Sequence, residues 1–597
     1  MKQRLLAVAL SIGLIGTTLP APARANDELG GGHKSKHVLL ISIDGMHAVD
    51  YENCVASNTC PTLAALGKTG VNYTRTTTSR PSDSFPGLMA LVTGGSPRTV
   101  GAFYDVAYDR VLAPPKVATG NQLPGGDCVV GQIHRNSDGS TGTETEYEEG
   151  NEFDETQLNG RPAPAKSALD LIDGNVTSIN PDRLIRDPFN NCQPVYSWNF
   201  VRTNTIFGVI HAAGGYTAWS DKHAAYASVS GPTGTNQPSN LDDYYSPEVN
   251  SLQIVLPGLT TANGFDCGKL VPNGNDWTTD FDAIKCNDQL KVNGILNQIH
   301  GRTHLGTSKA PVPVAFGMDF QAVSVGEKLI EPKSAVRTDA NAGGYEDAQG
   351  TPRPKMLGQI QYVDAAIGQM VAALKAEGLF DSTTIIVTAK HGQSPIDPNR
   401  FFPIPGNSGN NGMPPSAVLL PPNPNLLPPV YSDPTNGLGI AEDDISQIWL
   451  ADASRTGDAV TALENAATAI GLGQIYFGAS LNTLFNPPGV PNNPGPCCFL
   501  RPGGDPRTPD IVVIPNVGVV YTGSLAKQSE HGGYAWDDTN VMLLVSNPHI
   551  QARTMHSFVE TAQVAPTILK LLGLDPNALD AVRAEGTPVL PGLDTDR

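Results

Sequence analysis

Short apolar runs that end in polar residues recur along the chain, and they predict strands of a parallel sheet. The first run is His37–Ile43, and it ends at Asp44. A continuous Val/Leu/Ile run is typical of a strand buried on both faces, as in a parallel sheet. Three later stretches, Val312–Phe316, Thr384–Thr388 and the segment around Leu525, are also followed by polar residues. Ligands bind at the carboxyl ends of such strands, so we expect these polar side chains to meet at one site.

Helical periodicity separates the predicted strands. The clearest helix covers Lys355–Ala376, where apolar residues recur at helical spacing, and others are predicted at Leu88–Thr93, Phe281–Ile299 and Ser557–Leu572. Strands that alternate with helices predict an α/β fold: a mostly parallel sheet with helices on both faces.

Polar or Pro/Gly-rich stretches interrupt this alternation and predict large loop insertions at about 111–195, 224–310 and 395–508. The third contains a strand pattern at Ser446–Leu450 and a helix pattern at Ala459–Ile470, which suggests a small α+β unit. We expect one catalytic domain over residues 26–597, carrying these insertions.

Charge and composition exclude some function classes. The formal net charge is 39 − 58 = −19, which argues against a nucleic-acid polymer as the partner. Small phosphate esters remain possible substrates, because a bound metal can dominate the local field. A hydrophobic content of 40% with 16% charged residues is that of a globular protein.

The N-terminus has the pattern of a signal peptide, residues 1–25. Lys2 and Arg4 precede the apolar run Leu5–Leu19, and Ala23-Arg24-Ala25 is a cleavage pattern. A retained membrane helix is disfavoured, because the run is short and prolines follow it. We expect no other membrane span, cleavage after Ala25, and a periplasmic or secreted protein.

The eight cysteines fit an exported protein, because oxidising compartments permit disulfides. Neighbouring positions suggest the pairs Cys54–Cys60 and Cys267–Cys286. The adjacent Cys497 and Cys498 are consistent with a vicinal disulfide or with two separate bridges.

Ser84 is a candidate nucleophile. It precedes Phe85-Pro86 at a predicted helix start, where free N–H groups favour an anion. A hydroxyl there can attack phosphorus if a metal lowers its pKa. A helix-capping serine is the alternative, and Ser82 and Thr78 are rival nucleophiles.

Two His-Gly pairs, at His391 and His531, supply candidate metal ligands together with the carboxylates. Nitrogen and oxygen ligands suit zinc, and also manganese or magnesium. Lys222 follows a predicted strand, Tyr216–Ser220; it is a candidate for binding an anionic group, or a solvated surface lysine.

Several of these motifs together resemble the alkaline phosphatase superfamily, and within it the type I phosphodiesterase/nucleotide pyrophosphatase branch. They are Asp44-Gly45 after the first strand, Ser84-Phe85-Pro86-Gly87, Leu91-Val92-Thr93-Gly94, His391-Gly392, His531-Gly532 and Val564–Leu569. The resemblance covers about residues 37–110, 200–222, 312–395 and 510–577.

The resemblance implies a mechanism with two divalent metals, usually zinc, flanking a Ser or Thr nucleophile. Asp44, Ser84 and His391 would belong to the nucleophile-side metal. Asp319 and His531 would belong to the other metal. A covalent phospho-Ser84 intermediate, resolved by water, is then implied.

The chain departs from the family pattern at three positions. Lys390 stands where the family has a carboxylate, Val323 where it has a histidine, and Gly87 where it has an asparagine. Three explanations are open: other residues substitute, such as Asp221, Glu530 or Asp537; one metal acts with the Lys390 ammonium; or the fold binds without catalysis.

These features predict an exported, metal-dependent phosphoester hydrolase with Ser84 as nucleophile and with Lys390 and Lys222 in the site. The expected cofactor is one or two divalent ions, zinc above all, and the expected substrate is a small phosphoester. Alternatives are a sulfatase- or phosphonate-hydrolase-like enzyme of the same superfamily, or a non-catalytic binding protein.

Overall fold

The computed structural model describes residues 34–117, 127–136, 139–147, 173–174, 176–331, 337–338, 340–404, 412–419, 426, 440–485, 505–521 and 527–593. The predicted signal peptide and the Cys497-Cys498 pair lie outside these residues.

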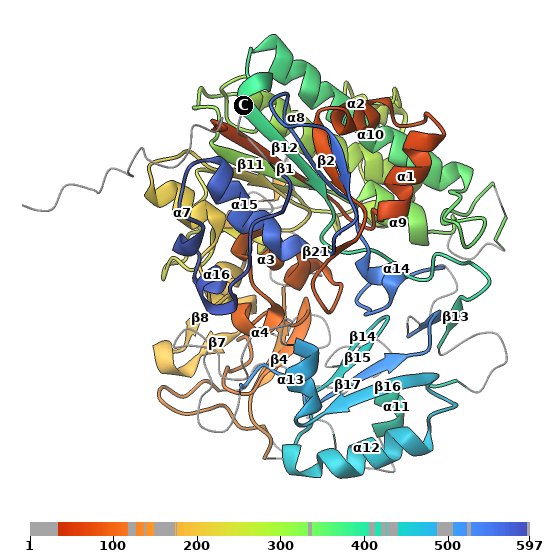
Figure 1. The fold of residues 1–597 in the computed structure, drawn as a ribbon. Helices are drawn as coiled ribbons and strands as arrows, with labels where there is room; N and C mark the ends of the chain where they lie inside the picture. Colours follow the sequence, from red (N-terminus) through yellow and green to blue (C-terminus); the bar gives the residue numbers. More distant parts are fainter. Residues whose placement is uncertain are drawn as a thin grey trace, which may run out of the picture.

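A nine-stranded mixed sheet forms the centre of the molecule, with strand order β20-β2-β19-β12-β1-β11-β9-β10-β6 (Figure 1). Strand β1 (His37–Ile43) pairs in parallel with β11 (Ala315–Phe320) on one side and β12 (Thr383–Thr388) on the other. The remaining strands are β2 (Gly70–Tyr73), β6 (Asp173–Gly174), β9 (Ala218–Ser220), β10 (Asp243–Pro247), β19 (Leu543–Ser546) and β20 (Arg553–Met555). Antiparallel pairing occurs at β12–β19, β19–β2 and β10–β6. The predicted α/β fold with a mostly parallel sheet is confirmed.

Helices cover both faces of this sheet. One face carries α1 (Ala48–Ala56), α2 (Pro61–Gly67), α8 (Phe281–Ile299), α9 (Ala322–Lys328) and α10 (Pro354–Ala376). The other carries α3 (Ser84–Thr93), α7 (Ile206–Ala212) and α15 (Val564–Leu571). Leu39 and Ile41 belong to the core on the first face, and Val38 and Leu40 to the core on the second. Successive side chains of a strand point to opposite faces, so β1 must be apolar throughout to serve two cores.

A separate antiparallel sheet of order β14-β15-β17-β16 lies at the bottom of Figure 1; three of its strands belong to the third predicted insertion, and β17 directly follows it. Its strands are β14 (Ile440–Glu442), β15 (Ser446–Ile448), β16 (Leu472–Phe477) and β17 (Ile511–Pro515). It packs with α11 (Pro415–Leu419) and α12 (Thr456–Asn465) around a core of its own that includes Trp449 and Leu463.

Smaller elements complete the fold. They are β3 (Thr76–Thr77), α4 (Pro97–Val100), β4 (Val106–Asp109), β5 (Thr143–Glu146), β7 (Arg186–Asp187), β8 (Gln193–Pro194), α6 (Ser197–Phe200), β13 (Phe402–Pro403), α13 (Ser480–Phe485), β18 (Val519–Val520), α14 (Trp536–Thr539), β21 (Val559–Glu560) and α16 (Asp580–Glu585).

Several predicted boundaries differ from the structure, and two of these differences have a clear physical cause. Strand β11 begins at Ala315 rather than at Val312, because Pro311 and Pro313 have no N–H to donate to a sheet. Helix α15 begins at Val564 rather than at Ser557, because the preceding β21 pairs with β3.

Disulfides join Cys54 to Cys60 and Cys267 to Cys286, as predicted, and Cys128 to Cys192. Among the described helices, none is both long enough and apolar enough to cross a bilayer.

Candidate active site

The carboxyl ends of three adjacent strands bring the predicted site residues together. Asp44 follows β1, Asp319 is the fifth residue of β11, and Lys390 and His391 follow β12. The parallel register aligns Ser42 of β1 with Asp319 on one side and with Thr388 on the other. Each of the four predicted side chains is at most 1% exposed.

Lys390 lies at the centre of this cluster. Its Nζ is 3.3 Å from Asp44 Oδ2, 3.4 Å from Asp319 Oδ2 and 3.6 Å from Asp221 Oδ1. Burial by itself would lower the pKa of Lys390, but the three carboxylates outweigh it and raise that pKa above its ordinary value. The ammonium therefore stays charged inside the protein.

The two central carboxylates have opposite pKa shifts. Burial alone would raise the pKa of Asp44, but Lys390, His391 and Lys222 outweigh it and hold that pKa well below its ordinary value. Burial and the neighbouring Asp44 raise the pKa of Asp319 well above its ordinary value. Gln321 Nε2 donates hydrogen bonds to both carboxylates, at 2.8 Å to Asp319 Oδ2. Asp44 is thus the ionised member of the pair.

Ser84 is the first residue of α3, and its side chain does not cap that helix. The cap is Asp83, whose Oδ2 accepts from the backbone N–H of Phe85 at 3.2 Å. Lys222 Nζ instead donates to Ser84 Oγ at 3.1 Å. The rival hydroxyls donate to backbone oxygens, Ser82 to Asp538 at 2.5 Å and Thr78 to Lys390. The geometry favours Ser84 over both rivals.

Lys222 is buried in the site rather than solvated at the surface. It is 5% exposed, and its Nζ lies 3.8 Å from Asp44 Oδ2. Lys222 and Lys390 also share an aromatic neighbour: their ammonium groups lie 5.5 and 4.4 Å from the centre of the Tyr226 ring. The pair gives the neighbourhood of Ser84 a local positive charge in an acidic protein.

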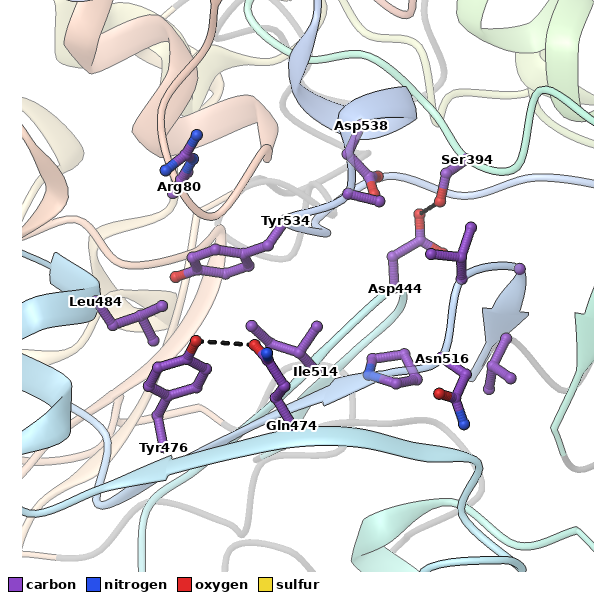
Figure 2. A pocket seen from close by; sticks show the side chains of 15 residues that line it. Arg80, Ser394, Asp444, Gln474, Tyr476, Leu484, Ile514, Asn516, Tyr534 and Asp538 are labelled. Atoms are coloured by element: carbon purple, nitrogen blue, oxygen red, sulfur yellow. Dashed lines mark hydrogen bonds between the residues drawn. The ribbon is translucent and has the colours of Figure 1, made fainter.

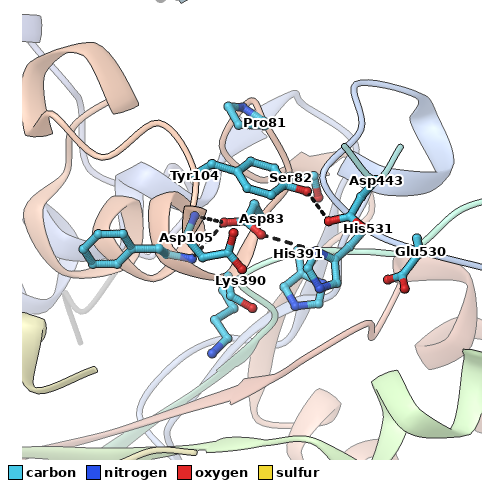
Figure 3. Close-up of polar contacts among 12 residues, drawn as sticks. Pro81, Ser82, Asp83, Tyr104, Asp105, Lys390, His391, Asp443, Glu530 and His531 are labelled. Carbon is cyan, nitrogen blue, oxygen red and sulfur yellow. Dashed lines mark hydrogen bonds and ion pairs between the residues drawn. The ribbon is translucent and has the colours of Figure 1, made fainter. Parts of the chain in front are cut away.

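His391 and His531 lie side by side, with ring centres 4.2 Å apart (Figure 3). His391 Nδ1 is hydrogen-bonded to the Gly392 carbonyl oxygen at 2.9 Å, and its Nε2 lies 3.4 Å from Asp44 Oδ2. Burial and the neighbouring His531 lower the pKa of His391 to about 4. The ring is therefore neutral at pH 7, the form that binds a metal.

The donor set fits a divalent ion in part. Asp44 Oδ1, Asp319 Oδ1 and His391 Nε2 are buried nitrogen or oxygen atoms without a hydrogen-bond partner. However, the Lys390 ammonium contacts both carboxylates and repels a cation from the space between them. Within the described residues, no three of the predicted carboxylate and imidazole ligands have ligand atoms that all lie within 4.8 Å of one another. These ligands are Asp44, Asp319, His391 and His531. An ion beside His391 fits these residues better than a metal pair does.

Three residues of this neighbourhood were not singled out by the sequence patterns: Asp83, Gln321 and Asp443. Asp83 Oδ1 lies 3.4 Å from His531 Nδ1. Tyr104 donates to Asp443 Oδ2 at 2.7 Å, and both appear beside His531 in Figure 3. Gln321 could have been found from its position, because it directly follows the strand that carries Asp319. Asp443 lies in the third predicted insertion, and no motif or periodicity in the sequence marks it as a site residue.

A cavity of about 390 Å³ lies between the second sheet and the loops of the catalytic core (Figure 2). Arg80 and Asp538 line it from the core, and Gln474 and Tyr476 from β16. Ser394 donates to Asp444 across this boundary at 2.9 Å. None of the predicted catalytic residues lines this cavity.

Comparison with solved structures finds several phosphoester-cleaving enzymes. Murine ectonucleotide pyrophosphatase/phosphodiesterase 5, as an inactive variant with AMP, is 13% identical with a TM-score of 0.48, covering 91% of this chain and 96% of that chain. Its human counterpart is 12% identical with a TM-score of 0.48, covering 90% and 95%. The alkaline phosphatase PafA is 11% identical with a TM-score of 0.49, covering 91% and 96%. TM-scores below 0.5 give no basis for transferring function.

Comparison with curated protein sequences gives no match. The sequence profile of the type I phosphodiesterase / nucleotide pyrophosphatase family matches residues 38–143 and 340–420. These segments contain Asp44 and Ser84, and Lys390 and His391, whereas Lys222, Asp319 and His531 lie outside them. The predicted resemblance to the type I phosphodiesterase / nucleotide pyrophosphatase family is therefore confirmed over these two segments of the chain.

Proposed function

We propose that the protein is an exported, metal-dependent hydrolase of small phosphodiesters or pyrophosphates, with Ser84 as its nucleophile. The observation that carries this proposal is the position of Ser84. It begins a ten-residue helix, its hydroxyl is left out of the cap, and its Oγ accepts from the Lys222 ammonium at 3.1 Å. The helix N-terminus and the ammonium both favour the alkoxide form of Ser84 and an anionic phosphoryl group.

In the proposed reaction, attack forms a bond between Ser84 Oγ and phosphorus and breaks the bond from phosphorus to the leaving oxygen. Water then cleaves the phospho-serine and restores the hydroxyl. The Lys390 ammonium is held by Asp44, Asp319 and Asp221, so its charge is already oriented when substrate binds. Such pre-oriented charge stabilises the additional negative charge of the transition state.

The proposed metal ligands are Asp44, His391, His531 and Asp319, with Ser84 as the group to be activated. A bound divalent ion, zinc above all, would supply Lewis-acid charge and lower the pKa of the serine hydroxyl. In the neutral His391 ring, Nδ1 donates to the Gly392 carbonyl, so Nε2 keeps its lone pair on the side of Asp44. Lys390 supports a site with one metal, because it provides the positive charge that a second ion would bring.

The proposed location is the periplasm or the outside of the cell, after removal of residues 1–25. Three disulfides support an oxidising compartment. N-terminal sequencing of the secreted protein should begin at Asn26, and retention of Met1 would contradict cleavage.

The direct test is hydrolysis of a nitrophenyl phosphodiester by the purified chain. We expect EDTA to stop turnover and Ser84→Ala to lower kcat at least ~10³-fold, because the nucleophile is lost. Ser57→Ala, at the exposed end of α1, is the matched control and should keep wild-type activity. Normal turnover by Ser84→Ala would exclude it as nucleophile, and a correctly folded protein that cleaves no ester in a panel would favour the binding-protein alternative.

A further inference from the structure

A second buried cluster of ligand-type side chains lies behind the Asp44-Gly45 turn. It consists of His47, Asp50, Glu327 and Tyr345, each at most 4% exposed. His47 and Asp50 are the N-cap and first turn of α1, and Glu327 lies in α9. The proposed reaction uses none of the four. Among the described residues, His47, Asp50 and Glu327 form the one group of three His, Cys, Asp or Glu side chains whose ligand atoms all lie within 4.8 Å of one another.

The four polar atoms form a compact cage. His47 Nδ1 lies 3.1 Å from Asp50 Oδ2, 3.2 Å from Glu327 Oε1 and 2.9 Å from the Tyr345 hydroxyl. The Tyr345 hydroxyl lies 2.6 Å from Glu327 Oε1 and 3.1 Å from Asp50 Oδ2. An ion bound at about 2.0–2.1 Å separates its ligands by ~3.3 Å in a tetrahedron and by ~2.9 Å in an octahedron. The distances from His47 Nδ1 lie close to this range.

The second nitrogen of His47 supports the same interpretation. His47 Nε2 lies 2.9 Å from the Gln393 carbonyl oxygen, to which it can donate, and 3.1 Å from the Gln393 backbone nitrogen, from which it can accept. The tautomer that donates to the carbonyl leaves the Nδ1 lone pair for an ion. Metal-bound histidines usually donate their other N–H to a backbone carbonyl or a carboxylate in this way.

His47 is the cationic partner that the described chain offers to this cluster. Two buried carboxylates face its imidazole, and no lysine or arginine of the described chain pairs with Asp50 or Glu327 within 4.0 Å. Glu327 Oε2 is buried and has no hydrogen-bond partner. By contrast, the buried Asp288 has Lys291 at 2.9 Å. Buried carboxylates need such a cation, since isolated charges are costly to bury.

We propose that His47, Asp50 and Glu327 bind a divalent cation of the zinc or manganese type, with the Tyr345 oxygen beside it. One imidazole with carboxylate oxygens is the ligand set these ions prefer, whereas calcium takes six to eight oxygens. The ion would join the segment after β1 to helix α9, which follows β11, and so would lie behind Asp44. This site is separate from the proposed catalytic metal.

Elemental analysis of metal-stripped full-length protein, dialysed against zinc, tests the proposal. Glu327→Gln should lower the bound zinc by one ion per chain and abolish the zinc-induced rise in Tm. His391→Ala should remove a different ion, so the double variant should lose both. Asp50→Asn repeats the test if Glu327→Gln does not fold, with circular dichroism as the check on folding.

Anomalous diffraction at the zinc edge from wild-type crystals provides an independent readout. A peak between His47 and Glu327 is expected. No peak there, together with unchanged zinc content in Glu327→Gln, would overturn the proposal and leave a hydrogen-bonded ion pair. Neither measurement depends on turnover, so the result stands apart from the proposed hydrolase activity.

Discussion

Two buried clusters lie on either side of the Asp44-Gly45 turn, and they differ in how their carboxylates are compensated. On one side, Asp44, Asp221 and Asp319 surround the Lys390 ammonium. On the other, Asp50 and Glu327 have only the His47 imidazole. Gly45 separates them: its φ is +85°, and a Cβ there would lie 2.7 Å from Glu327 Oε2.

The difference teaches where this protein can hold a cation. Where the chain supplies a lysine inside the cluster, the ammonium takes the charge-balancing role and disfavours a metal at that point. Where the chain supplies no lysine, a cation from solution can take that role. The family pattern puts a carboxylate at position 390, so substitution of this lysine tests the comparison directly.

The largest effect is expected from Lys390→Met. Loss of the ammonium removes the cation that contacts Asp44, Asp221 and Asp319 and leaves only Lys222 beside Asp44, so the free energy of unfolding should fall by about 3–5 kcal/mol in metal-free buffer. Activity toward the nitrophenyl diester should fall as well. Urea unfolding measures the change, with the exposed Lys68→Met as control. Unchanged stability would mean that the carboxylates are not charged in the folded protein.

Lys390→Asp should convert the first cluster to the family's ligand type. Replacing an ammonium by a carboxylate adds a ligand and removes the repulsion, so the variant should bind one more zinc ion per chain than the wild type. Elemental analysis after dialysis measures the count. An unchanged count would indicate that Val323, rather than Lys390, prevents the second ion.

The smallest effect concerns a carboxylate with neither lysine nor metal ligands beside it. Burial raises the pKa of Glu442 to about 7, although Ser416 and Ser446 donate hydrogen bonds to it. The folded state therefore binds more protons between about pH 4.5 and 7, and stability falls as pH rises through this window, by about 2–3 kcal/mol.

Glu442→Gln should reduce the dependence of the free energy of unfolding on pH between pH 5 and 8 by this amount, as measured by urea unfolding. Glu464→Gln, on the exposed face of α12, should keep it. Equal slopes in the two variants would show that Glu442 is ionised throughout.

Much of the fold follows from local patterns. Helix Phe281–Ile299 has the bounds that its pattern predicts, and strand β12 begins one residue before the predicted Thr384–Thr388, because each buries a continuous apolar face or run. Strand β11 begins later than its pattern predicts because of the prolines before it. Strand β21 was not predicted, because its two residues pair with a strand far away in the sequence.

The sequence by itself determined that Asp44 and His391 each follow a strand and that Ser84 begins a helix, because strand ends and helix starts are local features. Only the tertiary structure decided the surroundings of Lys390. Its partners Asp221 and Asp319 come from strands far apart in the chain, and strand order depends on how the whole sheet packs. The same holds for His47 and Glu327, which are 280 residues apart and meet only when α1 and α9 pack behind the turn.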